Sequence, residues 1–170
     1  MKTLFIVRHA KSSWDDPYLI DHQRPLNKRG LKAAPEMARR LKKRGFCPDA
    51  IVSSDALRAL ETAMAMAETL GLPGKTVHQN PAIYNATSDD IVQIVRRFKD
   101  HWKTVMVVGH NPTLTVVANQ FYPHLIENIP TAGIVMLRFN IPSWRLIHRD
   151  HVDSSTFDFP KNKPSSPGPS

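Results

Sequence analysis

The sequence contains a single cysteine, Cys47, among its 170 residues. One thiol cannot form a disulfide within the chain, and this fits a protein of a reducing compartment. The apolar runs at 4–7 and 105–108 have the length of a strand, far short of the roughly 20 residues that a membrane helix needs. The sequence therefore indicates neither a disulfide-stapled secreted domain nor a membrane partner.

An export signal is also lacking. The first seven residues are largely apolar, but Arg8, His9 and Lys11 interrupt the stretch at once. A buried first strand explains this pattern better than a signal peptide does. We therefore expect a cytoplasmic protein.

Acidic residues are few relative to basic ones, with 15 Asp and Glu against 23 Lys and Arg and a formal net charge of +8. This excess favours anionic partners such as phosphorylated small molecules, phosphoproteins or nucleic acid. The basic residues cluster at helical spacing within 24–44, where a solvated helix face is the plainest interpretation. Aromatic side chains do not interleave with them as in a nucleic-acid stacking platform, so we expect no nucleic-acid partner.

Short apolar runs alternate with amphipathic segments along the chain. The length fits one domain at 1–160, followed by a tail at 161–170 whose Pro, Ser and Gly content predicts disorder. Strands are predicted at 3–8, 50–53, 76–78, 104–108, 134–139, 144–148 and 156–159. Helices are predicted at 27–44, 55–70, 88–98 and 111–121.

Local signals set the ends and faces of these helices. Pro35 predicts either a kink in the first helix or a later start. Ser88 is predicted to cap the third helix, and Asn111 with Pro112 to begin the fourth. The predicted inward faces consist of Leu31, Ala34, Met37, Ala38 and Leu41 in the first helix and of Leu57, Leu60, Met64 and Ala67 in the second.

Strands that alternate with helices at these lengths predict an α/β fold, a three-layer α/β/α sandwich around a mostly parallel sheet. The continuous apolar character of 5–7 and 105–108 suits strands that are covered on both faces. Ligands of such sheets bind beyond the carboxyl ends of the strands. We therefore expect the chemistry of this protein at those ends.

Three of the predicted strands lead into polar residues of a similar kind. The first ends in Arg8 and His9, the second runs into a helix whose first turn holds Arg58, and the third ends in Gly109 and His110. Each residue alone has an ordinary explanation as a surface, capping or packing residue. If the three strands are neighbours, however, two arginines and two histidines converge on one crevice.

These residue types suit phosphoryl transfer. A guanidinium group matches phosphate oxygens and stays charged, so Arg8 and Arg58 are expected to bind phosphate. A neutral imidazole can attack phosphorus and form a phosphohistidine. We expect His9 to be this nucleophile, with its other ring nitrogen held as a donor by a backbone carbonyl. His110, protonated beside a bound dianion, is expected to donate to the phosphoryl oxygens.

The motifs resemble those of the histidine phosphatase superfamily, and within it the small phosphohistidine phosphatases of the SixA type. The matching blocks, in the family's order, are VRHAKS at 7–12, RPL at 24–26 with Gly30, SSDALRA at 53–59 with ETA at 61–63, and VGHNP at 108–112. The resemblance implies a phosphoglycerate-mutase-like fold without a large lid insertion. It also implies His9 as catalytic nucleophile and a phosphate pocket of Arg8, Arg58 and His110.

Further residues are assigned through the resemblance. Arg24, Ser12 and Asn111 are candidates for the substrate side of the pocket, although an ordinary loop arginine is the alternative for Arg24. The family needs no metal, and no other cofactor is implied. The sequence also contains a group of possible metal ligands at His148, Asp150, His151 and Asp153. We interpret them as scattered polar residues on and after a late strand, which explains them better than a metal site does.

The sequence departs from the family pattern at two places. Ala10 replaces the glycine of the commonest first motif and is expected to narrow the pocket without removing the chemistry. Larger relatives place an acidic proton donor in the region of 81–90, where this chain has no carboxylate before Asp89. Asp89 has an ordinary role in the first turn of a helix, and water is the other candidate donor.

The missing acid bears on the substrate. The alkoxide that leaves a phosphomonoester needs a proton from a general acid, whereas the nitrogen of phosphohistidine is protonated more easily. We therefore predict a monomeric enzyme that hydrolyses phosphohistidine on a protein. The alternatives are a phosphomonoesterase of the same superfamily, acting on a small phosphorylated molecule, and a non-catalytic module that binds phosphorylated ligands.

Overall fold

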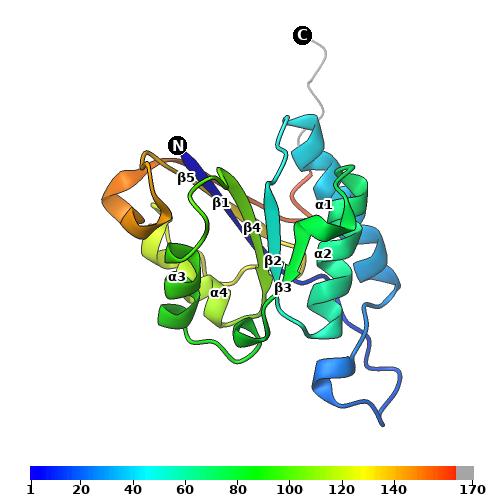
Figure 1. The fold of residues 1–170 in the computed structure, drawn as a ribbon. Coiled ribbons are helices and arrows are strands. Elements are labelled where there is room, and N and C mark those ends of the chain that lie inside the picture. The colour runs from blue at the N-terminus through cyan, green and yellow to red at the C-terminus, as the bar shows by residue number, and fades with distance from the viewer. Residues whose placement is uncertain (164–170) are drawn as a thin grey trace.

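The computed structural model describes residues 1–163 of the chain. It contains one sheet with two helices on each face (Figure 1), so the predicted three-layer α/β/α sandwich is confirmed. The predicted tail at 161–170 lies mostly outside the described residues, and the domain boundary at 160 stays a prediction.

The sheet has six strands and its layers have four α-helices within the described residues. The strands are β1 (Lys2–Arg8), β2 (Ala50–Ser53), β3 (Val77–Gln79), β4 (Thr104–Gly109), β5 (Ile134–Phe139) and β6 (Val152–Asp158). The helices are α1 (Lys28–Lys43), α2 (Leu57–Thr69), α3 (Ser88–Arg96) and α4 (Thr113–Phe121). No helix within residues 1–163 is long and apolar enough to cross a membrane.

The strand order is β3-β2-β4-β1-β5-β6. The first four strands of that order are parallel, and β5 and β6 are antiparallel to their neighbours. Arg8 pairs with Gly109, and Ser53 pairs with Val108. This register makes the ends of β2, β4 and β1 neighbours, as the convergence of the sequence motifs requires.

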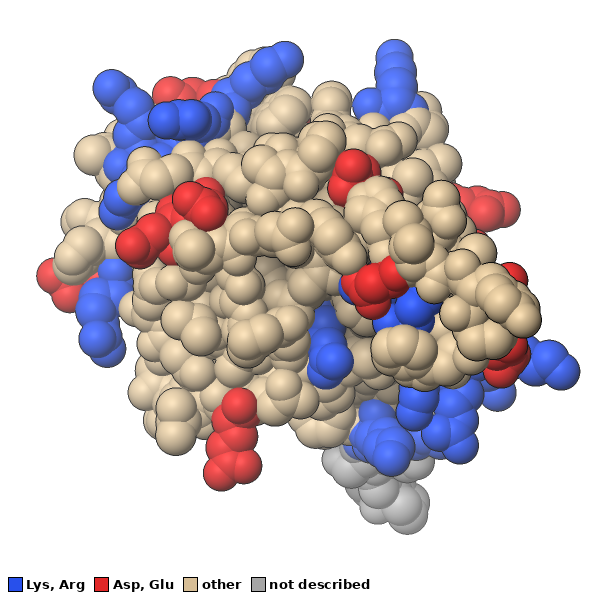
Figure 2. All heavy atoms as spheres, turned by 90° about the horizontal axis from the view of Figure 1, so that it is seen from below, with Lys and Arg blue, Asp and Glu red and all other residues tan. Residues whose placement is uncertain are grey.

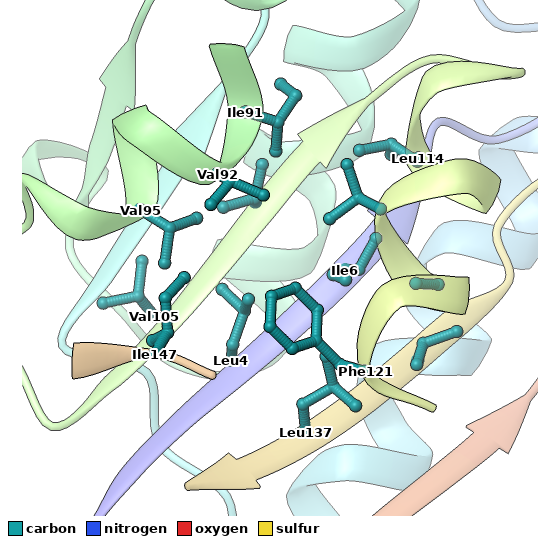
Figure 3. Packing of buried hydrophobic residues seen from close by; sticks show 14 of the residues in the cluster. Leu4, Ile6, Ile91, Val92, Val95, Val105, Leu114, Phe121, Leu137 and Ile147 are labelled. Carbon is teal, nitrogen blue, oxygen red and sulfur yellow. The ribbon is translucent and has the colours of Figure 1, made fainter. Parts of the chain in front are cut away.

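The central strands are buried on both faces. Side chains of β1 alternate between two apolar clusters, with Leu4 and Ile6 on the face of α3 and α4 and with Phe5 and Val7 on the face of α1 and α2. Figure 3 shows the first cluster around Leu4 and Ile6. Burial of this kind stabilises a fold by roughly 25 cal/mol per Å² of apolar surface, and here it fixes the strand ends that carry the polar residues.

Of the inward face predicted for α2, Ala67 is buried as predicted, but two of the larger side chains are not. Leu57 and Met64 are 37% and 44% exposed, while Ala59, Ala63 and Met66 are fully buried. The helix is apolar on most of its circumference, so its periodicity could not choose between two faces. The face with small side chains lies inward, in contact with α1 and the sheet.

Helix α1 runs from Lys28 to Lys43 with Pro35 inside it, which excludes the later start. The side chain of Asn27 caps it by accepting from the backbone N–H of Gly30. The inward face predicted for α1 is wrong at Leu31, which is 54% exposed. The other four predicted side chains are buried.

The caps of α3 and α4 differ from the predictions. Thr87, not Ser88, is the N-cap of α3, because its side chain and that of Asp90 form a reciprocal capping box. Helix α4 begins at Thr113 after Pro112 and has no N-cap side chain. The predicted strand at 144–148 is also wrong: Trp144–Leu146 is a 3-10 turn, held by a hydrogen bond from the Trp144 N–H to Asp100.

Candidate active site at the carboxyl edge of the sheet

His9 directly follows β1, and its side chain is buried. Its Nδ1 lies 2.7 Å from the carbonyl oxygen of Ala10. Because a carbonyl only accepts hydrogen bonds, Nδ1 carries the proton and Nε2 keeps a free lone pair. Burial first, and then the nearby charges of three arginines, lower the pKa of His9 to about 4. The ring is therefore neutral at neutral pH, as a nucleophile must be.

The backbone around His9 is held from several sides. Its N–H donates to the carbonyl of Gly109 across the strand pair, and the N–H of Ala132 contacts the carbonyls of Arg8 and His9. The hydroxyl of Thr62 accepts from the N–H of Ala10 at 2.9 Å and donates to the carbonyl of Arg58 at 2.7 Å. Thr62 thus connects the loop that carries the nucleophile with the helix that carries a phosphate-binding candidate.

The ring of His110 lies beside that of His9, with the two centroids 5.2 Å apart. Nε2 of His110 is 2.8 Å from the hydroxyl of Ser54, which also accepts from the N–H of Ala56. With the Ser54 hydrogen directed to Nε2, the neutral ring carries its proton on Nδ1. Burial, followed by the charges of His9 and Arg58, lowers the pKa of His110 to about 3. A bound phosphate dianion would act in the opposite direction and raise it.

Two buried donors of this cluster lack partners among residues 1–163. They are Nε of Arg8 and Nδ1 of His110, although another nitrogen of Arg8 donates to the carbonyl of Ile129 at 2.9 Å. An unpaired buried donor costs on the order of 1–3 kcal/mol. An anion that accepts from both groups is therefore favoured at this position.

Arg58 is occupied by a carboxylate that the sequence did not single out. Its two terminal nitrogens donate to Asp21, one to the backbone carbonyl at 2.7 Å and one to the side chain at 2.9 Å. Arg24 and the hydroxyl of Tyr84 donate to the same carboxylate. The hydrogen bond from Tyr84 first, and then the two arginines, hold the pKa of Asp21 well below its usual range. Asp21 is therefore ionised at neutral pH.

The remaining candidate residues lie around this centre in different ways. Arg24 is buried, donates to Ser13 and lies with one nitrogen 2.5 Å from the hydroxyl of Ser12. The amide of Asn111 is used by the loop at 128–129 and by the first turn of α4. The structure thus brings together Arg8, His9, Arg58 and His110, with Arg24 and Ser12 behind Asp21. Asp21 itself could have been found only through its spacing of three residues from Arg24.

The histidines and carboxylates of the described residues do not gather into a metal-ligand cluster. Within residues 1–163 no three His, Cys, Asp or Glu side chains lie close enough together to hold one metal ion. In the late polar group, Nδ1 of His148 lies 3.4 Å from a carboxylate oxygen of Asp150. Asp89 is exposed in the first turn of α3.

The fold and this cluster define an α/β protein whose sheet edge holds a buried, neutral histidine beside a second histidine and two arginines. The family model of the histidine phosphatase superfamily (branch 1) matches residues 4–83. An uncharacterised protein of Mycobacterium tuberculosis is 31% identical over 143 residues, which cover 78% of this chain and 86% of that protein. This chain belongs to the histidine phosphatase superfamily, as the motifs predicted.

Two further comparisons bear on fold and length. A putative phosphohistidine phosphatase SixA from Agrobacterium tumefaciens matches with a TM-score of 0.73 and 29% identity, over 81% of this chain and 90% of that one. The predicted phosphoglycerate-mutase-like fold is confirmed by this likeness. An uncharacterised chloroplastic protein of Arabidopsis thaliana is 37% identical over 118 residues, or 65% of this chain; the match spans only 54% of that protein. The superfamily and the solved phosphatase support phosphatase activity.

Proposed function

We propose that this protein is a metal-independent phosphatase that hydrolyses phosphohistidine on a protein and carries the phosphoryl group on His9 between two chemical steps. The observation that carries the proposal is the state of His9. Its ring is buried and neutral, and its Nδ1 is engaged by the Ala10 carbonyl. Nε2 remains free in a cluster that also contains two unpaired buried donors.

In the first step Nε2 of His9 attacks the phosphorus of the substrate. The bond between phosphorus and the substrate nitrogen breaks as the bond to Nε2 forms, and the leaving imidazole takes up a proton from solvent. Arg8, Arg58 and His110 offset the charge on the phosphoryl oxygens. The hydrogen bond from Nδ1 to the Ala10 carbonyl stabilises the positive charge that the His9 ring acquires.

In the second step water attacks phosphorus and the bond to Nε2 breaks. Inorganic phosphate leaves with the oxygen and the protons of the water, and His9 returns to its neutral form. Because no group has to be oxidised or reduced, the two steps need only the substrate and water.

The absence of a suitable acid supports a phosphoramidate substrate. Asp21 is the carboxylate that contacts Arg58 and Tyr84, and its strongly lowered pKa leaves it without a proton to donate. The hydrogen bond to Asp21 raises the pKa of Tyr84, which makes this hydroxyl a weaker acid. A phosphomonoester would need such a donor for its alkoxide, whereas an imidazole leaves without one.

The loop beside the site supports a protein as the carrier of the phosphohistidine. Trp14, Tyr18 and Ile20 are 75%, 93% and 62% exposed on the segment that also carries Asp21. In Figure 1 this segment, drawn in blue between β1 and α1, projects beyond the rest of the molecule. Exposed Trp and Tyr side chains are typical of protein interfaces. The single cysteine supports a cytosolic location, which is part of the proposal.

The test compares turnover of a phosphohistidine protein with a panel of phosphomonoesters, with rapid quench to trap labelled enzyme. We expect preference for the phosphohistidine protein, label on His9, and no loss of activity in chelator. His9→Ala should abolish hydrolysis and labelling, a loss of at least ~1,000-fold, while its circular dichroism stays that of the wild type. Full activity of His9→Ala contradicts the mechanism, and preference for a phosphomonoester contradicts the substrate.

A further inference from the structure

A basic pocket lies next to the candidate active site. It encloses about 410 Å³, and Lys11, Arg29 and Lys161 line it together with the apolar surface of Phe159 and Pro130. The three cations come from three separate segments: the loop after β1, the first turn of α1 and the chain after β6. We call these residues the basic pocket.

The basic pocket is tied to the nucleophile by short stretches of chain. Lys11 is the second residue after His9. Thr131 of the pocket wall precedes Ala132, whose N–H contacts the carbonyl of His9. On the other side α1 approaches so closely that a Cβ at Gly30 would lie 2.2 Å from the Lys11 carbonyl oxygen. This contact holds the beginning of α1, with Arg29, against the loop that carries the nucleophile.

Figure 2 looks onto this edge of the sheet. Lys and Arg side chains form one group at the lower right of this face and another at its upper left, and a few lie near its centre. The substrate is expected at this edge, and the positive charge there lies in separate groups on opposite sides of the face.

The charges of the basic pocket are not neutralised within the described residues. The side chains of Lys11, Arg29 and Lys161 belong to exposed residues, and these side chains form no hydrogen bond or ion pair with any group of residues 1–163. Arg40, further along α1, contrasts with them because it contacts Glu36 and Asp158 at 3.1 Å. Because no carboxylate of the described residues pairs with these three cations, they can form ion pairs with carboxylates of a partner.

We propose that the basic pocket binds an acidic segment of the phosphoprotein, next in sequence or in space to its phosphohistidine. The inference rests on the proposed function. Three cations spread around an apolar floor fit several carboxylates on a peptide, with an apolar neighbour against Phe159, better than they fit one compact anion. The pocket therefore selects among phosphohistidine proteins by the charge beside the phosphorylated residue.

The test uses two phosphohistidine peptides that differ only in a flanking run of Glu or of Gln, prepared with the run at several spacings. For wild type we expect kcat/KM to be about tenfold higher for the best Glu peptide than for its Gln counterpart, through KM, since exposed ion pairs contribute up to ~1 kcal/mol each. The preference should fall as salt is added.

The variant Lys11→Gln/Arg29→Gln/Lys161→Gln should lower the Glu-to-Gln ratio to about 1. The matched control Arg39→Gln/Lys42→Gln/Lys43→Gln removes the same charge from exposed positions at the other end of α1, and it should keep the wild-type ratio. Lys161→Glu, which lies outside the superfamily motifs, should lower the ratio even if the triple variant does not fold.

The outcomes separate the two proposals. A wild type that hydrolyses both peptides equally at every spacing overturns the basic pocket as a docking site and leaves the proposed function standing. A triple variant that keeps the tenfold preference, or a control that loses it, overturns the docking site as well. A wild type that hydrolyses neither peptide overturns the proposed function and, with it, the inference.

Discussion

The strand ends and the loop at 12–24 meet at one site but use their polar atoms in opposite ways. His110, which directly follows β4, keeps one buried nitrogen without a partner among the described residues, and so does Arg8 at the end of β1. In the loop, Arg24 and Asp21 pair with each other, and Asp21 also takes up the donors of Arg58. The strand ends thus leave capacity for a ligand, while the loop neutralises charge.

This difference separates two roles: the strand ends offer donors for a ligand, and the loop positions the side chains around them. The hydrogen bonds of the sheet and the packing of the core hold the strand-end backbone in place. The donors there therefore stay unpaired, because their side chains cannot move to reach other acceptors. The ends of the loop are joined by a single antiparallel bridge between Ser12 and Leu26, and the ion pair of Asp21 with Arg58 holds the loop against α2. A phosphoryl group would compete with Asp21 for Arg58, so we expect the loop to limit how tightly the site holds phosphate.

The largest effect should follow from removing a strand-end donor. His110→Ala deletes the ring that offers an unpaired donor to the phosphoryl oxygens, and we expect kcat to fall by roughly 100- to 1,000-fold, as for other lost oxyanion donors. Single-turnover labelling of His9 measures the loss. His124→Ala, a change at an exposed histidine far along the chain, serves as the control. A drop below about threefold would mean that the free donor of His110 is not used.

The next effect concerns the acid side of the pH profile. With a pKa of about 4, His9 stays neutral well below the 6.5 of an ordinary histidine. We expect kcat/KM at pH 5 to remain within about twofold of its value at pH 7, whereas an ordinary histidine nucleophile would lose about 25-fold. The same lowered pKa makes folding stability depend on pH. Between pH 6.5 and pH 4 the unfolded state binds more protons than the folded state, so the free energy of unfolding should fall as the pH drops from about 6.5 to about 4.

Two measurements check this prediction. A pH profile of kcat/KM, corrected for spontaneous hydrolysis of the substrate, gives the acid limb. Ring-nitrogen NMR of the free enzyme gives the titration of His9 directly. An acid limb near 6.5 would show that burial does not depress the pKa of the nucleophile.

The same contrast explains what the sequence could predict. The runs at 4–7 and 105–108 are apolar without interruption, so the strands and their polar ends follow from pattern alone. The contact of Asp21 with Arg58 joins residues that are 37 positions apart, one of them in an irregular loop. Neither hydrophobic periodicity nor a helix-capping motif in the sequence predicts such a contact. The error in the predicted inward face of α2 has a related cause. Small side chains stabilise a helix only through the surface that they pack against, and the sequence of the helix alone does not show that surface.

The smallest effect should come from the loop itself. Asp21→Asn keeps the size of the side chain and one acceptor but removes the charge that occupies Arg58 and Arg24. We expect inorganic phosphate to inhibit the variant about two- to fivefold more strongly, because the anion no longer competes with a carboxylate at an exposed ion pair. Asp89→Asn, on the exposed first turn of α3, is the matched control and should leave the inhibition constant unchanged. Weaker inhibition in Asp21→Asn would mean that the carboxylate orients Arg58 for phosphate instead of competing with it, and the loop would then belong with the strand ends as part of the binding pocket.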